Sequence, residues 1–269
     1  MSYETILNTY WLPHIGAWPL NEVTSSKIKE VLAGLKVVAK TKKNILGPIR
    51  GVMGAAGINP NPANGIEFRK RQKAPVERYT PPQRASLLSA LTGQPKVYFA
   101  LLFACGLRPG EALALRWTDY DGEELDVSKQ ITRRRLENST KTSKRRRVYV
   151  PTWARAILNE HTTRFSGEWI FVNEIGDHYK DTDVLNDAWR AAHKKARLPY
   201  RIPYVCRHTR AAELLSIGIT PADAAKQLGN SPEIFLRTYA EFIEMYAQNQ
   251  NKERFEGVGV DNLPTKKKG

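Results

Sequence analysis

The sequence is poor in cysteine and in long apolar runs. It has two cysteines in 269 residues, Cys105 and Cys206, and both stand among apolar residues. This usage excludes a disulfide framework and a CxxC-type zinc site. The longest apolar stretch, residues 97–107, is shorter than the ~20 residues that a helix needs to cross a bilayer. The first 20 residues lack the charged start and apolar run of a secretion signal. We therefore expect a cytoplasmic protein with no membrane partner.

Groups that indicate metal or nucleotide chemistry are also scarce. His14, His161, His178 and His193 have no ligand-like spacing with one another or with the cysteines. The acidic residues in 119–124 form a polar turn without the dispersed partner carboxylates of a two-metal site. The chain has no Walker-type glycine loop. We therefore expect no metal, ATP or other cofactor.

Acidic residues are outnumbered, because 42 Lys and Arg stand against 27 Asp and Glu and leave a net charge of +15. Such a surplus favours polyanions, nucleic acid above all. Residues 129–147 carry nine basic side chains and one acid, and the basic residues of the first 77 positions cluster at 40–43 and 69–73. The predicted DNA-binding residues are Lys40, Lys42, Lys43, Arg69, Lys70, Arg71, Arg133, Arg134, Arg135, Lys144, Arg145 and Arg146.

Helical periodicity and turn residues divide the chain into two domains. Residues 1–72 have the pattern of a small helical bundle, and residues 73–79 are predicted to be a linker. Thr80, followed by two prolines and a glutamine, is typical of a helix start. Residues 80–243 indicate short helices with a small antiparallel sheet from 124–136 and 144–151, and a brief strand at 168–173. The polar tail 244–269 is expected to be disordered without a partner. The predicted fold class is mostly α with a small antiparallel β-sheet (α+β).

Four segments of the second domain carry a resemblance. They are ACGLRPGEALALRW at 104–117, STKTSKRRRVYVP at 139–151, YVCRHTRAAELL at 204–215 and QLGNSPEIFLRTYAEF at 227–242. In order and spacing they resemble the four signature segments of the tyrosine recombinase, or phage integrase, family. The resemblance implies a helical core-binding DNA-binding domain followed by the family's catalytic domain. The N-terminal domain resembles its counterpart loosely, through YWLPHIGAWPLNEVTSSKI.

The matching residues can supply metal-free phosphodiester cleavage. Tyr239 matches the nucleophile, which would form a 3′-phosphotyrosyl link without ATP. Arg108 and Arg207 match the two arginines that grip the phosphate, where the planar guanidinium suits the non-bridging oxygens. Lys141 matches the general acid, and neighbouring cations would lower its pKa. Lys144 is the alternative acid.

Two positions depart from the family pattern. Tyr204 stands where the family most often has His, and Asn230 stands where it most often has His or Trp. Both can still hydrogen-bond a phosphate, so both are predicted catalytic-site residues, but neither is a good base near neutral pH. The base is therefore open, and removal of the Tyr239 proton by the field of the arginines or by water is one interpretation. His208 is a candidate, and the competing interpretation is that it packs or hydrogen-bonds within the fold.

The resemblance implies a site-specific DNA recombinase, the integrase of a phage or other mobile element, acting in DNA recombination and viral genome integration. The implied partners are duplex DNA attachment sites, three further copies of the chain in a homotetramer, and DNA-bending or directionality factors at the nucleoid of a prokaryotic host. The tail would be exchanged between protomers. With no arm-binding domain ahead of the core-binding one, the chain is expected to be either a simple recombinase or a fragment of a longer integrase, and helix signals from the third residue favour the fragment. A telomere resolvase or type IB topoisomerase, and a catalytically impaired DNA-binding regulator, are the alternatives.

Overall fold

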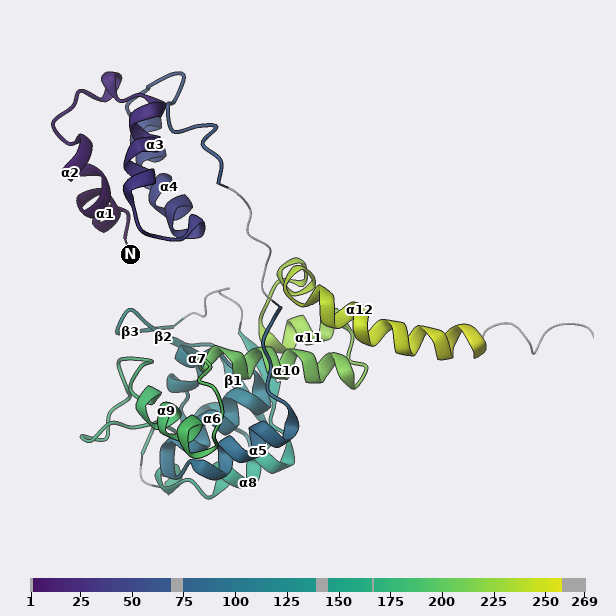
Figure 1. Ribbon diagram of the computed structural model, residues 1–269. Coiled ribbons are helices and arrows are strands. Elements are labelled where there is room, and N and C mark those ends of the chain that lie inside the picture. The colour runs from purple at the N-terminus through teal and green to yellow at the C-terminus, as the bar shows by residue number, and fades with distance from the viewer. Residues whose placement is uncertain (1, 69–74, 139–144, 166, 258–269) are drawn as a thin grey trace, which may run out of the picture. The chain divides into compact units, whose positions relative to one another are not determined.

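The computed structural model describes residues 2–68, 75–138, 145–165 and 167–257, and side chains as far as residue 246 (Figure 1). The chain divides into two compact units, Met1–Ala74 and Pro75–Gly269. The division falls inside the segment predicted as a linker. In the part of the chain that is described, no helix is long and apolar enough to span a membrane.

The regular elements of the first unit, within its described residues, are all helices. Thr24 begins the first of its two long helices by accepting a hydrogen bond from the backbone N–H of Lys27, as an N-cap does. Trp11 is buried and donates from Nε1 to the carbonyl of Ile45 at 2.8 Å, which ties the N-terminal turns to the last helix. The elements are α1 (Tyr3–Ile6), the π-helical turn η1 (Leu7–Trp11), α2 (Leu12–Ile15), η2 (Leu20–Glu22), α3 (Ser25–Gly34) and α4 (Ala39–Ala55).

The second unit opens with the helix start that the sequence predicts. Thr80 accepts from the N–H of Gln83, and the Gln83 side chain accepts from the N–H of Thr80, which is a capping box. Its helical elements before the C-terminal part are α5 (Pro81–Ala90), α6 (Gly93–Cys105), α7 (Pro109–Leu113), η3 (Trp117–Asp119), α8 (Thr152–Asn159), η4 (Thr162–Phe165) and α9 (Asn186–Lys195).

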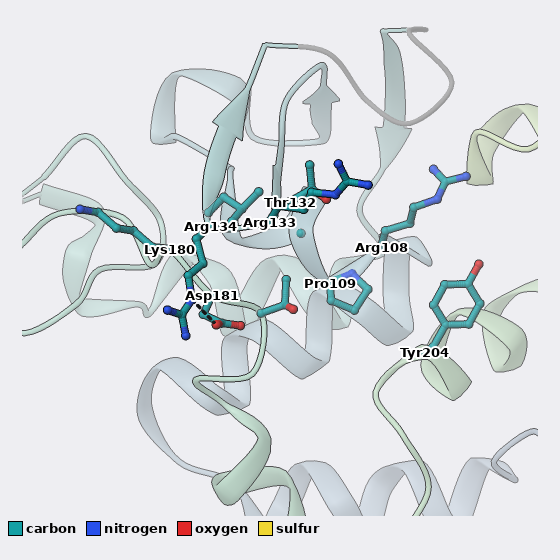
Figure 2. Close-up of a pocket in the computed structure, with 11 residues that line it drawn as sticks. Arg108, Pro109, Thr132, Arg133, Arg134, Lys180, Asp181 and Tyr204 are labelled. Carbon is teal, nitrogen blue, oxygen red and sulfur yellow. Dashed lines mark hydrogen bonds and ion pairs between the residues drawn. The ribbon is translucent and has the colours of Figure 1, made fainter. Parts of the chain in front are cut away.

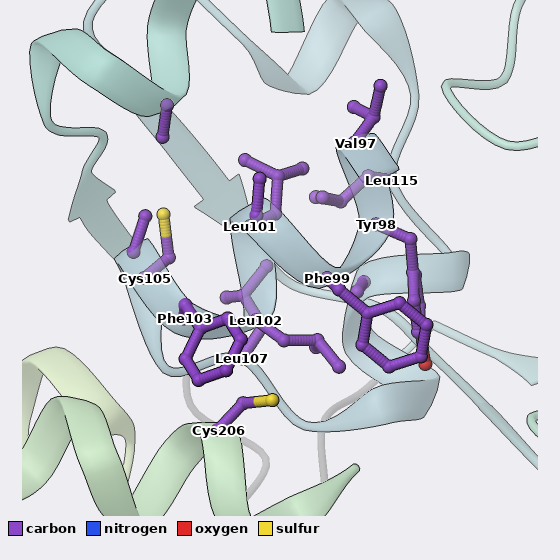
Figure 3. Packing of buried hydrophobic residues seen from close by; sticks show 14 of the residues in the cluster. Val97, Tyr98, Phe99, Leu101, Leu102, Phe103, Cys105, Leu107, Leu115 and Cys206 are labelled. Atoms are coloured by element: carbon purple, nitrogen blue, oxygen red, sulfur yellow. The ribbon is translucent and has the colours of Figure 1, made fainter. Parts of the chain in front are cut away.

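The core of this unit is built around α6, which is apolar on every side. Its residues from Val97 to Cys105 are all buried (Figure 3). Phe99 stacks on Trp189 of α9 with ring centroids 4.0 Å apart, and α8 and α10 pack against α6. A helix that is hydrophobic all round needs such complete cover. Cys105 and Cys206 are both buried, free thiols in this unit.

The strands form two antiparallel pairs rather than the one small sheet that the sequence predicts. β1 (Glu124–Val127) pairs with β4 (Arg146–Tyr149), and β2 (Gln130–Thr132) pairs with β3 (Arg135–Glu137). Two residues between β1 and β2 turn the chain, so the ladders remain separate. The predicted strand at 168–173 is reduced to isolated bridges, such as the one that joins Trp169 to Arg116.

The C-terminal helices are α10 (Tyr204–Ser216), α11 (Pro221–Leu228) and α12 (Pro232–Gly257), and they share a core of their own. Two predictions are wrong here. Val76 packs against this core and Tyr79 is buried in the larger one, so the C-terminal part of the predicted linker belongs to the second unit. The predicted disordered tail is helical as far as Gly257, and residues 258–269 lie outside the described part.

Candidate active site

Arg108 lies between α6 and α7, and a glycine makes its position possible. Gly106 ends α6 with a left-handed φ of 64°. A Cβ at this residue would lie 2.2 Å from the Leu228 side chain of α11, so only glycine allows α11 to approach so closely. The chain then turns through buried Leu107 and presents Arg108 at the start of α7.

Arg108 is held by a buried carboxylate three residues further on. Glu111 accepts from the Arg108 backbone N–H at 2.9 Å and from its Nη1 at 2.6 Å. Arg146 of β4 donates to the other side of the same carboxylate, from Nη2 at 2.6 Å and from Nη1 at 3.2 Å. Burial opposes the ionised form of Glu111, but Arg146 and Arg108 outweigh it and hold the pKa of this carboxyl below its usual value.

This ion pair contradicts the predicted DNA-binding role of Arg146 and adds Glu111 to the residues of the site. Arg146 was predicted to bind DNA, but it is 8% exposed and its Nε also donates to the carbonyl of Gln227 at 2.9 Å. Its guanidinium is therefore a structural group that joins β4 to α7 and to the end of α11. Glu111 is not among the residues predicted from the sequence, although an acid within the apolar run EALAL is a usable signal.

Arg207 of α10 is fully buried, and its guanidinium points at the ends of α6 and α11. It donates from Nη1 to the carbonyl of Gly106 at 2.7 Å, and from Nη2 to the carbonyl of Leu228 at 2.5 Å. Burial, and then the charge of Arg108, lower its pKa to about 10, so it stays protonated at neutral pH. Its Nε is a buried donor that has no partner among the described residues.

Asn230 connects the two arginines. Its Oδ1 accepts from Arg207 Nη2 at 2.5 Å and from Arg108 Nη2 at 3.3 Å. Gly229, with a left-handed φ of 65°, precedes it and gives its carbonyl to Arg108 at 3.0 Å. Because the amide oxygen is shared by two guanidinium groups, the amide N–H donors of Asn230 remain for another acceptor.

Tyr239 lies in α12, where the helix is kinked at this residue, with φ −113° and ψ 19°. Its ring is 1% exposed and packs against Phe235 and Phe242. Its hydroxyl lies 3.0 Å from Nδ1 of His208, the residue that follows Arg207. Burial raises the pKa of Tyr239 to about 12, although the charges of Arg207 and Arg108 act against that rise. Arg108, Arg207 and Asn230 thus form one hydrogen-bonded cluster, and the charges of both arginines reach the Tyr239 phenol.

Tyr204 marks the open side of this site. It begins α10, is 37% exposed, and lines a pocket of about 620 Å³ together with Arg108 (Figure 2). Figure 2 shows its hydroxyl and the Arg108 guanidinium pointing the same way. Of the predicted catalytic residues, Lys141 lies outside the described residues, as does its alternative, Lys144.

The far side of the pocket is basic. Arg133 and Arg134 form the tight turn between β2 and β3, both with positive φ, and both are exposed. Arg134 pairs with Asp181 at 3.2 Å, and Lys180 beside it lines the pocket. Lys180 is not among the residues predicted from the sequence, because nothing local distinguishes a single lysine in a loop.

The remaining predicted DNA-binding residues differ in exposure where the structure describes them. Arg135 and Arg145 are exposed, and Arg145 pairs with Asp126. Lys40 and Lys43 are exposed on α4, and Lys42 is half-buried. Arg69, Lys70 and Arg71 lie outside the described residues. Across the described positions, no three His, Cys, Asp or Glu side chains cluster as metal ligands do.

Comparisons with known proteins agree with this geometry. The phage integrase family matches residues 78–242. A XerC-like tyrosine recombinase of Caldanaerobacter subterraneus is 28% identical over 58% of this chain and 48% of its own length. The prophage integrase IntR of Escherichia coli is 25% identical over 64% of this chain and 49% of its own length. The chain therefore spans about half the length of the curated relatives it matches.

Solved structures show the same fold. The Tn1549 transposon integrase, in complex with a circular-intermediate DNA, superposes with a TM-score of 0.79 at 20% identity, over 93% of this chain and 91% of that one. A lambda integrase tetramer bound to a Holliday junction gives a TM-score of 0.69 at 17% identity, over 87% of this chain and 70% of that one. The predicted fold class, mostly α with a small antiparallel β component, is confirmed. Because the match covers residues 78–242, more than half of this chain, the chain belongs to the phage integrase family.

Proposed function

We propose that the chain is a site-specific DNA recombinase, the integrase of a phage or other mobile element. The observation that carries this proposal is that Arg108 and Arg207 meet at Asn230, while the Tyr239 phenol lies within hydrogen-bond distance of His208, the residue next to Arg207. A phosphodiester bound there would have its non-bridging oxygens between two guanidinium groups. That placement stabilises the charge that builds on the phosphoryl oxygens in the transition state.

The reaction needs no energy source, because the bond energy is kept in the intermediate. The Tyr239 oxygen attacks the phosphorus, the P–O5′ bond breaks, and the chain becomes linked to the 3′ phosphate. The leaving 5′ oxygen takes a proton from Lys141. Support for this donor is its position in the sequence, since Arg146 holds the start of β4 against Glu111 and the Lys141 segment leads directly into that strand. Attack by the 5′ hydroxyl of another strand reverses the step and completes strand transfer.

The test is a covalent adduct on a suicide duplex. Binding sites are first selected from a random duplex pool, and a nick is placed just 3′ of the scissile phosphate so that the released 5′-hydroxyl fragment diffuses away. In EDTA the wild-type chain should form an adduct that survives a denaturing gel. Tyr239→Phe should bind the duplex and form none. Tyr246→Phe is the matched control, since it removes an exposed hydroxyl from the same helix.

Other outcomes identify the alternatives. An adduct that requires magnesium, or that persists in Tyr239→Phe, refutes the proposed nucleophile. Relaxation of supercoiled DNA that lacks any selected site would indicate a topoisomerase. Binding without an adduct in the wild-type chain would indicate a regulator that has lost activity.

We also propose how the recombinase assembles on DNA and where in the cell it acts. The lambda integrase structure is a tetramer on a Holliday junction, and this supports a homotetramer on two attachment sites, with the C-terminal segment exchanged between protomers. Exposed apolar side chains on α12, Ile234 and Leu236, would suit such a contact. DNA-bending or directionality factors would act with it at the nucleoid in the cytoplasm of a prokaryotic host. Mass measurement of the complex on a synthetic Holliday junction tests the stoichiometry.

A further inference from the structure

The nucleophile has a partner that the family pattern does not assign. Nδ1 of His208 lies 3.0 Å from the Tyr239 hydroxyl, within hydrogen-bond distance. The two rings meet edge to face, with centroids 5.7 Å apart. His208 is half-buried and directly follows Arg207. The phosphate-gripping side chain and the group that holds the phenol are therefore neighbours on one turn of α10, and both move with that turn.

Tyr204 places the same histidine relative to the open pocket. It lies one helical turn before His208, and the two rings also meet edge to face, with centroids 5.1 Å apart. Tyr204 is exposed where it lines the pocket with Arg108. Tyr204, His208 and Tyr239 thus form a row that leads inward from the pocket to the nucleophile.

The charge state of His208 decides the direction of the hydrogen bond. Burial, and then the charge of Arg207, lower the pKa of His208 to about 4, so its imidazole is neutral near pH 7. Tyr204 on its own helix and Tyr239 on α12 also face it, and the raised pKa of Tyr239, about 12, keeps that phenol protonated near pH 7. The Tyr239 O–H therefore donates and Nδ1 accepts. The same bond fixes the phenol, which would otherwise rotate.

We propose that His208 is the base of the reaction, holding the Tyr239 hydroxyl and taking its proton as the phenol oxygen bonds to phosphorus. The inference rests on the proposed function. The O–H bond breaks, the proton passes to Nδ1, the O–P bond forms, and the P–O5′ bond breaks as the 5′ oxygen takes a proton from Lys141. In the reverse step His208 returns its proton to the tyrosine.

A neutral, weakly basic imidazole is sufficient for this task. As the O–P bond forms, the phenol oxygen loses electron density and its proton becomes far more acidic than in free tyrosine. The bound phosphate also brings a negative charge between the arginines, which offsets the charge of Arg207 and makes His208 more basic in the complex. Tyr204 and Asn230, which replace the usual histidines, do not need to accept a proton in this scheme.

The experiment separates removal of the tyrosine proton from protonation of the leaving group. Two suicide duplexes are compared, one with the natural scissile phosphate and one in which sulfur replaces the bridging 5′ oxygen. A thiolate leaves without a proton donor, so loss of Lys141 should matter little on the sulfur substrate. Adduct formation is measured in single turnover at saturating protein, with DNA affinity and thermal unfolding measured alongside.

His208→Phe keeps the ring and removes the acceptor. It should slow the adduct by about 10²-fold or more on both substrates, the size typical of lost base catalysis, while DNA affinity stays within a few-fold. Lys141→Ala should be slow on oxygen and recover on sulfur. His208→Asn keeps an acceptor near the Nδ1 position, so it should retain the fold and DNA affinity of the wild type. Its adduct should still form slowly on both substrates. The wild-type rate should fall with acid as the imidazole becomes charged, and the His208→Asn rate should not.

Three results overturn the inference. The first is adduct formation by His208→Phe at a rate near wild type, and the second is recovery of its rate on the sulfur substrate. The third is adduct formation by His208→Phe that is faster than wild type, which would mean that the contact restrains the nucleophile. Each of these leaves the proposed recombinase standing, because the wild-type adduct is still observed. Absence of any wild-type adduct refutes the proposed function itself.

Discussion

Removing the charge of Glu111 should strongly destabilise the second unit, although only one side-chain atom is replaced. Glu111→Gln keeps the side-chain shape but removes the charge between Arg108 and Arg146. The carboxylate accepts four N–H groups from these two arginines at 2.6 to 3.2 Å and is fully buried. The amide cannot accept them all, and its own N–H donors would face a guanidinium. Removing one partner of a buried ion pair costs about 3–5 kcal/mol, so the midpoint should fall by about 6–20 °C for a unit of this size.

The measurement is thermal or urea unfolding, and pH supplies a second check. The pKa of Glu111 lies below its usual value in the folded protein, so its contribution is present above the unfolded pKa and is lost as pH falls through the folded pKa. The difference between wild type and Glu111→Gln should therefore be largest near pH 7 and shrink in acid. Glu123→Gln is the matched control, because Glu123 is 70% exposed in its pair with Arg155 and such pairs contribute about 0–1 kcal/mol. A Glu111→Gln cost no larger than that of the control would refute the reasoning.

Three further results are expected. Gly106→Ala should destabilise the second unit by about 1–3 kcal/mol in urea unfolding, because the residue has a positive φ and its Cβ would meet α11; an unchanged midpoint would contradict this. Asn230→Asp keeps the acceptor shared by the two arginines but replaces the N–H donors with negative charge, so adduct formation should slow by about 10²-fold in single turnover, and an unchanged rate would remove Asn230 from the site. DNA affinity should fall steeply with salt, and Arg133→Gln should reduce the slope of log affinity against log salt by about one; an unaltered slope would place this side chain away from phosphate.

The sequence predicted well where a local signal reports the structure. The capping residues at Thr80 marked a helix start that the structure has. Arg108 follows a glycine that ends α6, and Asn230 follows one that ends α11. Both glycines allow helix ends to approach and give carbonyls to the arginines. These short patterns describe backbone turns, and backbone turns are determined within a few residues.

The contacts that the sequence could not predict join residues far apart along the chain. Glu111 and Arg146 are 35 positions apart and meet only because β4 lies beside α7. In the sequence Arg146 is one cation in a run of four, and nothing distinguishes the buried member from the exposed ones on either side. His208 and Tyr239, 31 positions apart, needed the packing of α12 on α10 to be seen as partners. Pairing of this kind depends on tertiary structure rather than on periodicity.

The predicted disorder of the tail failed for a related reason. Its polar composition indicated a segment that cannot bury enough apolar surface to stay ordered. α12, however, is nucleated by the apolar side chains Phe235, Tyr239 and Phe242, which are buried against α10 and α11. Once these residues fix the first turns, each later residue adds a hydrogen bond at small entropic cost. The helix therefore extends past its buried part to Gly257.

The charges of the site explain how it can work without the histidines that its relatives most often have. Arg108 and Arg146 share the single carboxylate of Glu111, and Arg207 is held by backbone carbonyls and Asn230, so the three guanidinium groups and one carboxylate leave a surplus of two positive charges in the site. A phosphodiester carries one negative charge, and its pentacovalent transition state carries two. The surplus therefore matches the transition state better than the bound substrate, which is the condition for catalysis rather than mere binding. Neutral donors such as Tyr204 and Asn230 keep that balance, and a charged histidine in either place would increase the surplus.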